Sequence, residues 1–499
     1  MRASGEPSPR PVAGPHAEAI SIEYTMSQPE QQPVATSPSP HLWHEVRDVL
    51  RGAQRDYTTG SISRAIILLA IPMVLEMLMQ SVFELVDAYF VGQLGADALA
   101  AVGVAGTLLI LVLAVGIGLS MATTAMVARR IGEKDPEGAG VAAVQGLLAS
   151  AAISIPVSLI GIFFAADMLR LMATPESAVE VGTGYTAVLF GTNAVILFLF
   201  LINAIFRGAG DAVLAMKALA FANLLNIILD PLLIFGIGPF PEMGVTGAAV
   251  ATTIGRGVGV VYQCYLLRQG KSRVHLHLHH IRLALDVMKR LLRIAGPGIL
   301  QFLIGTASWL VLFRLINTFG EAAAAGYTVA IRILVFALLP SWGMGNAAAT
   351  LVGQNLGAGQ PDRAERSVWI TGFSNAVFLG VVAICMYVFA EPLIAFFTDD
   401  PAVIAIGQQC LRIISYTYVL FAFGAVTMQA FNGAGDTTTP TWINFFSYWM
   451  LQIPLAYVLA LGVGWEAAGV FASVAIAQGI LAIVSVIVFR RGHWKTKAI

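Results

Sequence analysis

Apolar stretches of about 20 residues or more recur along almost the whole chain, and they restrict its fold more than any other feature. Of the 499 residues, 57% are hydrophobic and only 12% are charged. A stretch of this kind can cross a bilayer as a helix, because a helix satisfies its backbone hydrogen bonds internally. The sequence therefore predicts an all-α polytopic membrane protein that lies in a lipid bilayer.

Boundaries placed at polar residues and at Gly/Pro turns give twelve predicted membrane spans. A basic linker at 270–287 separates the first six from the last six, so we expect an N-lobe at 61–269 and a C-lobe at 288–491. Tails at 1–60 and 492–499 complete the chain. The predicted spans lie near 64–92, 98–131, 138–165, 177–207, 213–237, 245–268, 288–318, 323–356, 363–390, 402–432, 438–462 and 466–490.

The N-terminal tail differs in composition from the rest of the chain. Residues 1–40 contain eight prolines and no apolar core, so we expect a disordered segment and no cleavable signal peptide. Residues 41–55 have the pattern of a short amphipathic helix. Such a helix is expected to lie at the membrane surface or to dock on the protein itself.

Basic residues predict the orientation of the spans. They gather before the first span, in the turns that follow the second, fourth and eighth spans, in the central linker and in the C-terminal tail. The turns at the other ends of the spans are mainly acidic. The positive-inside rule then places both termini in the cytoplasm, in agreement with an even number of spans. We expect the plasma (inner) membrane as the location.

The chain repeats itself at one offset. Ala70-Ile-Pro72 matches Ala295-Gly-Pro297, and Phe206-Arg-Gly-Ala-Gly-Asp211 matches Phe431-Asn-Gly-Ala-Gly-Asp436, in each case 225 residues further on. The segments 127–139 and 352–364 share the same offset. Six spans per repeat make the two repeats parallel, with an axis along the membrane normal. Transporters commonly place the substrate site between two such halves.

The first predicted span carries acids at a spacing that places them on one side of a helix. A helix turns by about 100° per residue, so positions 76, 80, 84 and 87 fall within an arc of about 80°. An intramembrane carboxylate costs about 2.5–3.5 kcal/mol or more, so these groups should face a water-filled cavity, a partner or a proton. The residues at these four positions are Glu76, Gln80, Glu84 and Asp87. We expect Pro72 near the start of the same helix, where the missing backbone N–H of a proline costs least.

Polar side chains also share one face of the fifth span. Asn223, Asn226 and Asp230 lie within about 60° on a helix. Their oxygens suit Na⁺ or the environment of a proton. Thr252 and Arg256, four residues apart in the sixth span, add a hydroxyl and a counter-charge. For the Asn and Thr residues, polar contacts between packed helices are an equally open interpretation.

The second repeat lacks these acids. Leu312 stands where the first repeat has Asp87, and no acid occurs between Thr438 and Leu461. Packing alone would predict similar polar groups in both repeats. The sequence therefore indicates that one lobe is specialised for an ion.

Other motifs have simpler explanations. The Gly-rich turns follow no strand and lack a GK[ST] ending, so tight turns are preferred over phosphate sites. The cysteines show no CxxC spacing and are assigned to packing rather than to disulfides or a metal. An HxHxHH cluster in the linker is treated as a solvated basic segment, with a Zn or Ni site as the alternative. The cysteines are Cys264, Cys385 and Cys410, and the histidines of the cluster are His275, His277, His279 and His280.

Five features of the chain point in one direction: the two repeats, the FRGAGD and FNGAGD turns, the first span, NIILDPLLIFG in the fifth span and GVTGAAVAT in the sixth. In combination they resemble the multidrug and toxic compound extrusion (MATE) family. The resemblance covers about residues 60–490. It implies two six-helix lobes around a central cleft and coupling roles for Asp87, Asn226, Asp230 and Thr252. It also implies a helix that bends at Pro72. The tenth span has no acid, which favours the DinF-like branch over the NorM branch.

The resemblance implies an efflux antiporter that exports cationic drugs or metabolites in exchange for H⁺ or Na⁺ and uses no other cofactor. Glu76, Gln80, Glu84 and Arg256 are expected to line the cleft. A lipid-linked oligosaccharide flippase of the related superfamily is the alternative. An enzyme is disfavoured because HExxH, GxSxG and CxxC are missing. With a net charge of zero, no nucleic-acid partner is expected, and we expect a monomer.

Overall fold

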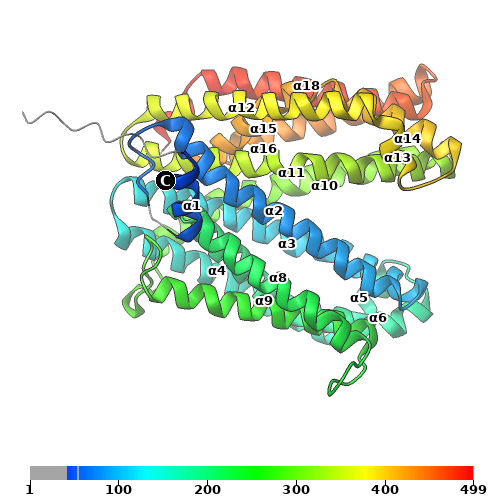
Figure 1. Ribbon diagram of the computed structural model, residues 1–499, viewed down its shortest axis with the longest axis horizontal. Coiled ribbons are helices and arrows are strands. Elements are labelled where there is room, and N and C mark those ends of the chain that lie inside the picture. The colour runs from blue at the N-terminus through cyan, green and yellow to red at the C-terminus, as the bar shows by residue number, and fades with distance from the viewer. Residues whose placement is uncertain (1–41, 53–54, 498) are drawn as a thin grey trace, which may run out of the picture. The chain divides into compact units, whose positions relative to one another are not determined.

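The computed structural model describes residues 42–52, 55–497 and 499, so the tail predicted at 1–40 lies outside the described residues. Helices dominate residues 42–499 (Figure 1). The first half contains α1 (Leu42–Arg51), α2 (Ile62–Gly92), α3 (Ala96–Gly132), α4 (Pro136–Phe163), α5 (Ala165–Leu171), α6 (Glu176–Gly191), α7 (Asn193–Ala209), α8 (Ala212–Ile234) and α9 (Gly244–Arg268). After the 3-10 turn η1 (Leu278–His280) come α10 (Leu285–Asn317), α11 (Glu321–Gly357), α12 (Pro361–Val388), α13 (Ala390–Ala395), α14 (Pro401–Ser415), α15 (Tyr418–Gly433), α16 (Thr438–Asn444), the π-helix η2 (Phe445–Gln452), α17 (Ile453–Tyr457), the π-helix η3 (Val458–Gly462), α18 (Glu466–Arg490) and the 3-10 turn η4 (His493–Thr496).

The number of spans agrees with the sequence, but two of them are broken. Among the described residues, ten helical segments are long and apolar enough to cross a membrane, and two bent helix pairs raise the total to twelve. The pair α6–α7 bends by 45° and the pair α14–α15 by 61°, so each of the spans predicted at 177–207 and 402–432 is built from two helices. Thr192 and Thr417 lie at the two breaks, and their hydroxyls bond backbone carbonyls of the preceding turn at 2.7 and 3.0 Å. Such side-chain bonds compete with helix continuation.

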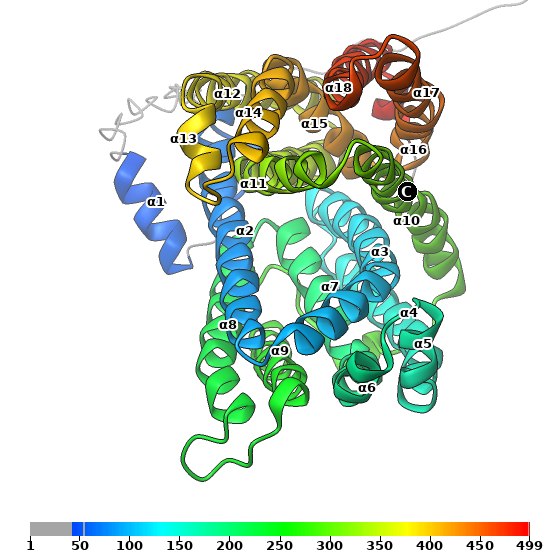
Figure 2. The ribbon, with the colours of Figure 1, turned by 90° about the vertical axis from the view of Figure 1, so that its right-hand side faces the viewer.

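The spans form two lobes, α2–α9 and α10–α18, which occupy separate halves of both views (Figures 1 and 2). Between them, α3 packs against α10 and α11, and α2 packs against α11. The lobes converge at the end that carries α1 and the C-terminus and diverge toward the other end (Figure 1). We call the end at which the lobes converge the closed end. Small residues allow the close approach there: a Cβ on Gly118 would lie 2.7 Å from the Ala295 carbonyl oxygen, and one on Gly343 2.7 Å from the Val74 side chain.

The contacts at the closed end follow the sequence repeat. A Cβ on Gly132, at the end of α3, would collide with the carbonyl oxygen of Gln354 on α11. A Cβ on Gly357 would collide in the same way with the carbonyl oxygen of Arg129. Gly357 and Gln354 are the positions 225 residues after Gly132 and Arg129. The two lobes therefore meet through equivalent surfaces, as an approximate two-fold relation requires.

A side chain at this contact should force the lobes apart. We expect Gly132→Ala to cost about 1–3 kcal/mol, because backbone atoms cannot yield to the added methyl group. The matched control is Gly103→Ala on the same helix, where a Cβ meets nothing within 4 Å. There, alanine should be neutral or stabilise the helix by up to about 1 kcal/mol. Melting temperatures of the purified variants would check this, and equal values for the two variants would contradict it.

The two GAGD motifs are tight turns at the closed end, as predicted. Gly210 and Gly435 adopt left-handed backbone with φ of 84° and 81°, a conformation that favours glycine. The carboxylate of Asp211 accepts hydrogen bonds from Ser272 Oγ and from the Arg273 N–H, at 2.7 and 2.8 Å. The first GAGD turn therefore holds the start of the linker in place, and its Asp211 carboxylate is hydrogen-bonded within the protein.

The helix predicted at 41–55 is α1, and it docks on the protein. Its Val46 and Val49 are buried in one apolar cluster with Leu69 of α2. The buried Glu45 carboxylate forms ion pairs with Arg55 at 3.4 Å and Arg64 at 3.1 Å. The structure thus supports the docking alternative for this helix.

Candidate functional site

A buried polar network joins α8 to α9 inside the first lobe. Asn226, Asp230 and Thr252 are 1%, 0% and 8% exposed. The backbone N–H of Thr252 can only donate, so the Asn226 side-chain oxygen faces it at 2.9 Å and also accepts from the Thr252 hydroxyl at 3.1 Å. The Asn226 NH₂ group then donates to Asp230 Oδ2 at 2.8 Å. Three of the four predicted coupling residues are therefore in direct contact, and the amide orientation follows from its partners.

Asp87, the fourth predicted coupling residue, lies on α2, which packs against α8. The two helices are joined by Asn223, whose NH₂ group donates to the Met79 carbonyl at 3.3 Å. The charge of Asp87 acts on Asp230. Asp87 Oδ1 and Asp230 Oδ1 are both buried without a hydrogen-bond partner among the described residues. A buried carboxylate oxygen with no partner calls for a proton or a cation.

Two further side chains lie around Asp87. The guanidinium of Arg256 sits 5.5 Å from the centre of the Phe83 ring, as in a cation–π contact, and its charge acts on Asp87. No ion pair within 4.0 Å joins Arg256 to a carboxylate in the described part of the chain. Tyr185 of α6 is buried and interacts electrostatically with Asp87, Asp230 and Arg256. No pattern in the sequence points to Tyr185, which is one of several aromatic residues in its apolar span.

Glu76 lies away from this network, in a buried ion pair. Its Oε1 is 2.8 Å from Nη1 of Arg207 at the end of α7, and the two side chains are 4% and 13% exposed. The Arg207 carbonyl in turn accepts a hydrogen bond from Thr350 of the second lobe at 3.0 Å. Glu76 therefore has a partner in the protein, which accounts for its burial without a substrate.

The sequence did contain a signal for this pair. The positions 225 residues after Glu76 and Arg207 are Gln301 and Asn432. Both members are thus charged in the first repeat and both are neutral amides in the second. A paired change of this kind is expected when two side chains neutralise each other.

The remaining predicted residues of α2 lie in two different settings. Gln80 donates to Glu84 Oε1 at 3.0 Å, and Glu84 is exposed. Pro72 is buried ten residues inside α2, so the expectation that it lies near the helix start was wrong. The helix begins at Ile62, close to the start of the predicted span at residue 64, so Pro72 lies inside the helix rather than in its first turn. A proline inside a helix removes one backbone hydrogen bond and weakens the helix there.

A helical membrane protein with two parallel six-span repeats, and with buried carboxylates in one lobe, has the architecture of a secondary transporter. The MatE family profile matches residues 72–232 and 297–458 of the chain, two segments whose starts are 225 residues apart. Together they cover more than half of the chain, so this protein belongs to the MatE family of membrane transporters.

Individual relatives are similar in sequence to this chain along most of their length. The chain is 27% identical over 445 residues to the probable multidrug resistance protein YoeA of Bacillus subtilis, which covers 88% of this chain and 96% of that protein. It is 26% identical over 402 residues to an FAD transporter of Shewanella oneidensis, with coverage of 80% and 88%. A solved outward-facing multidrug resistance MATE transporter superposes with a TM-score of 0.82 at 28% identity, over 90% of this chain and 98% of that one. These relatives are named as transporters rather than enzymes.

Proposed function

We propose that this protein is a secondary active antiporter that exports organic cations or amphipathic compounds in exchange for H⁺, by alternating access. The observation that carries the proposal is the pair of buried, unpartnered oxygens on Asp87 and Asp230. Each can take up a proton in one facing state and release it in the other. Such a cycle needs only a different proton affinity in the two states.

The hydrogen bonds of Asn226 favour H⁺ over Na⁺ as the coupling ion. Its side-chain oxygen already accepts two bonds from Thr252, and its NH₂ group faces Asp230. A bound alkali cation would need several oxygens directed toward it, and Asn226 turns its oxygen away from Asp230. A proton needs only one free carboxylate oxygen. We therefore assign proton coupling to Asp87 and Asp230, with Asn226 and Thr252 as positioning residues.

The orientation completes the proposal. The basic linker, α1 and the C-terminus lie at the closed end (Figure 1), so the positive-inside rule favours that end as the cytoplasmic one. The lobes then diverge toward the outside. Protonation of the site would favour this outward-facing state, and proton release to the cytoplasm would follow the return. The exposed Glu84 with its partner Gln80 offers a negative surface on α2 that suits a cationic substrate.

Transport by purified protein in liposomes tests the proposal. Ethidium is a permanent cation, so an acidic lumen does not trap it by protonation. We expect a proton gradient, acidic inside, to drive ethidium into the lumen of vesicles that contain the protein but not into empty vesicles. A larger response to a Na⁺ gradient would reverse the choice of ion, and no accumulation under either gradient would reject cation antiport.

A further inference from the structure

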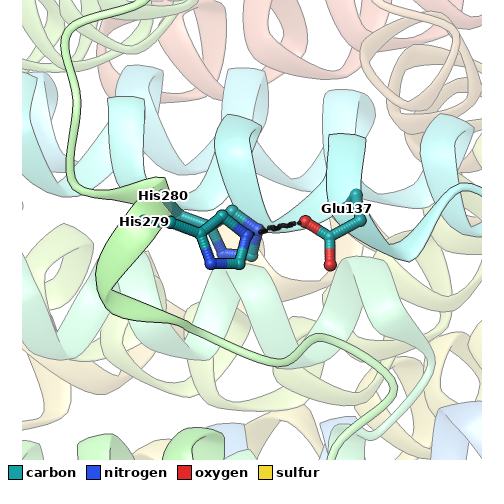
Figure 3. Close-up of side chains that lie close together, drawn as sticks. All are labelled: Glu137, His279 and His280. Carbon is teal, nitrogen blue, oxygen red and sulfur yellow. Dashed lines mark hydrogen bonds and ion pairs between the residues drawn. The ribbon is translucent and has the colours of Figure 1, made fainter.

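The linker histidines meet a carboxylate that is remote in sequence. His279 and His280 belong to η1, and Glu137 belongs to the first turn of α4, 142 residues before His279. Glu137 Oε2 lies 2.6 Å from His280 Nε2 and 3.0 Å from His279 Nε2. Figure 3 shows both imidazoles directed at the same carboxylate. The sequence could not pair these groups, because Glu137 is so far from the histidines along the chain.

The spacing of these atoms is close to that of ligands around one ion. One nitrogen from each imidazole and one carboxylate oxygen all lie within 4.8 Å of one another. Around a tetrahedral ion with bonds of about 2.0–2.2 Å, neighbouring ligand atoms are about 3.3 Å apart. Shifts of less than about 1 Å in the two bonded pairs would therefore admit a metal between them.

The donor set indicates which metals fit. Two imidazole nitrogens and one carboxylate oxygen form a known three-ligand set for Zn²⁺, with a fourth position left for water or another ligand. Imidazole favours Zn²⁺, Ni²⁺ and Cu²⁺ over the oxygen-seeking Mg²⁺ and Ca²⁺. The exposed His277 lies beside this group, with its ring centre 5.3 Å from that of His279, but it is not among the grouped ligands, so water is the expected fourth ligand.

The fold holds the His280 ring in place. Its side chain is 2% exposed and packs on Gly140, where a Cβ would lie 2.7 Å from the imidazole Cε1. His280 Nδ1 accepts a hydrogen bond from the His277 N–H at 3.2 Å, so Nε2 carries the proton that faces Glu137. A metal at Nε2 would replace that proton and move it to Nδ1, which sacrifices only this long bond.

We propose that Glu137, His279 and His280 bind a divalent late transition-metal ion such as Zn²⁺, which fastens the linker between the lobes to α4. A second clamp lies close by: the Gln145 side chain donates to the Arg282 carbonyl at 2.8 Å and accepts from the Ala284 N–H at 3.1 Å. The metal would add a coordinate link to these hydrogen bonds. This site is separate from Asp87 and Asp230, and its test does not depend on transport.

Zinc binding to the purified full-length protein tests the site. The protein should carry an affinity tag without histidines and be treated with a chelator before titration with ZnCl₂ by calorimetry. We expect one saturable Zn²⁺ site per chain. Glu137→Gln and His279→Gln should each weaken it at least about tenfold, and both side chains are more than half exposed, so folding is expected to survive. CoCl₂ should give the visible absorption of a tetrahedral site in the wild type but not in Glu137→Gln or His279→Gln.

His493→Gln is the matched control, because His493 is exposed and lies in the C-terminal tail outside the cluster. This variant should bind Zn²⁺ as the wild type does. Saturating ZnCl₂ should also raise the melting temperature of the wild type and of His493→Gln but not of the two cluster variants. The absence of a stoichiometric site in the wild type, or equal affinity in Glu137→Gln and His279→Gln, would overturn the proposal.

Discussion

Replacing Asp230 with asparagine is expected to reduce proton-driven ethidium accumulation to the level of empty vesicles. The amide keeps the size of the side chain and an oxygen that can accept from the Asn226 NH₂ group, so the contact between α8 and α9 should survive. It cannot take up and release a proton. Asp87→Asn should have the same effect, because both carboxylates have an oxygen without a hydrogen-bond partner. Initial rates of ethidium uptake, at equal amounts of reconstituted protein, give the measurement.

The matched control is Asp97→Asn, which changes an exposed acid in the first turn of α3. It removes one negative charge from the same lobe but leaves the buried network intact. Uptake by this variant should stay within about twofold of the wild type, since exposed substitutions of this kind usually have small effects. Undiminished uptake by Asp230→Asn would remove Asp230 from the coupling mechanism.

Periodicity and repetition made most of the fold predictable. Each predicted span corresponds to a helix or a bent pair, because a chain in lipid has few ways to satisfy its backbone. The same argument could not locate the bends at Thr192 and Thr417, since threonine is also common inside continuous membrane helices. It also described Pro72 as lying near the start of its helix, because proline is tolerated best in the first turn, although the predicted span already began at residue 64.

The candidate site was only partly predictable for a different reason. Helical spacing groups residues on one element, and it correctly joined Asn226 to Asp230. Which residues on separate helices meet depends on how those helices pack, and helical spacing does not determine that packing. Arg207 looked like an ordinary basic residue of a turn, yet it neutralises Glu76 on α2. Glu137 likewise meets His280 only because the linker folds back along α4.

The ion pair between Glu76 and Arg207 carries the second large prediction, which concerns stability. Arg207→Met keeps most of the side-chain volume but leaves a carboxylate that is 4% exposed without its partner. Breaking a buried pair in this way costs about 3–5 kcal/mol. We expect a clear fall in the melting temperature of the purified protein, together with a lower yield of monodisperse material.

A double variant separates the lost partner from lost packing. In Glu76→Leu/Arg207→Met the unpaired charge is gone, and an apolar pair of similar volume commonly restores the stability of a buried ion pair or exceeds it. Most of the fall in melting temperature should therefore be recovered. Arg170→Met is the control, because its pairs with Asp167 and Glu176 are half-exposed and its loss should leave the melting temperature unchanged. If the double variant melts no higher than Arg207→Met, the unpaired charge is not the cause. Lost packing of the buried Arg207 side chain would then be the more important contribution.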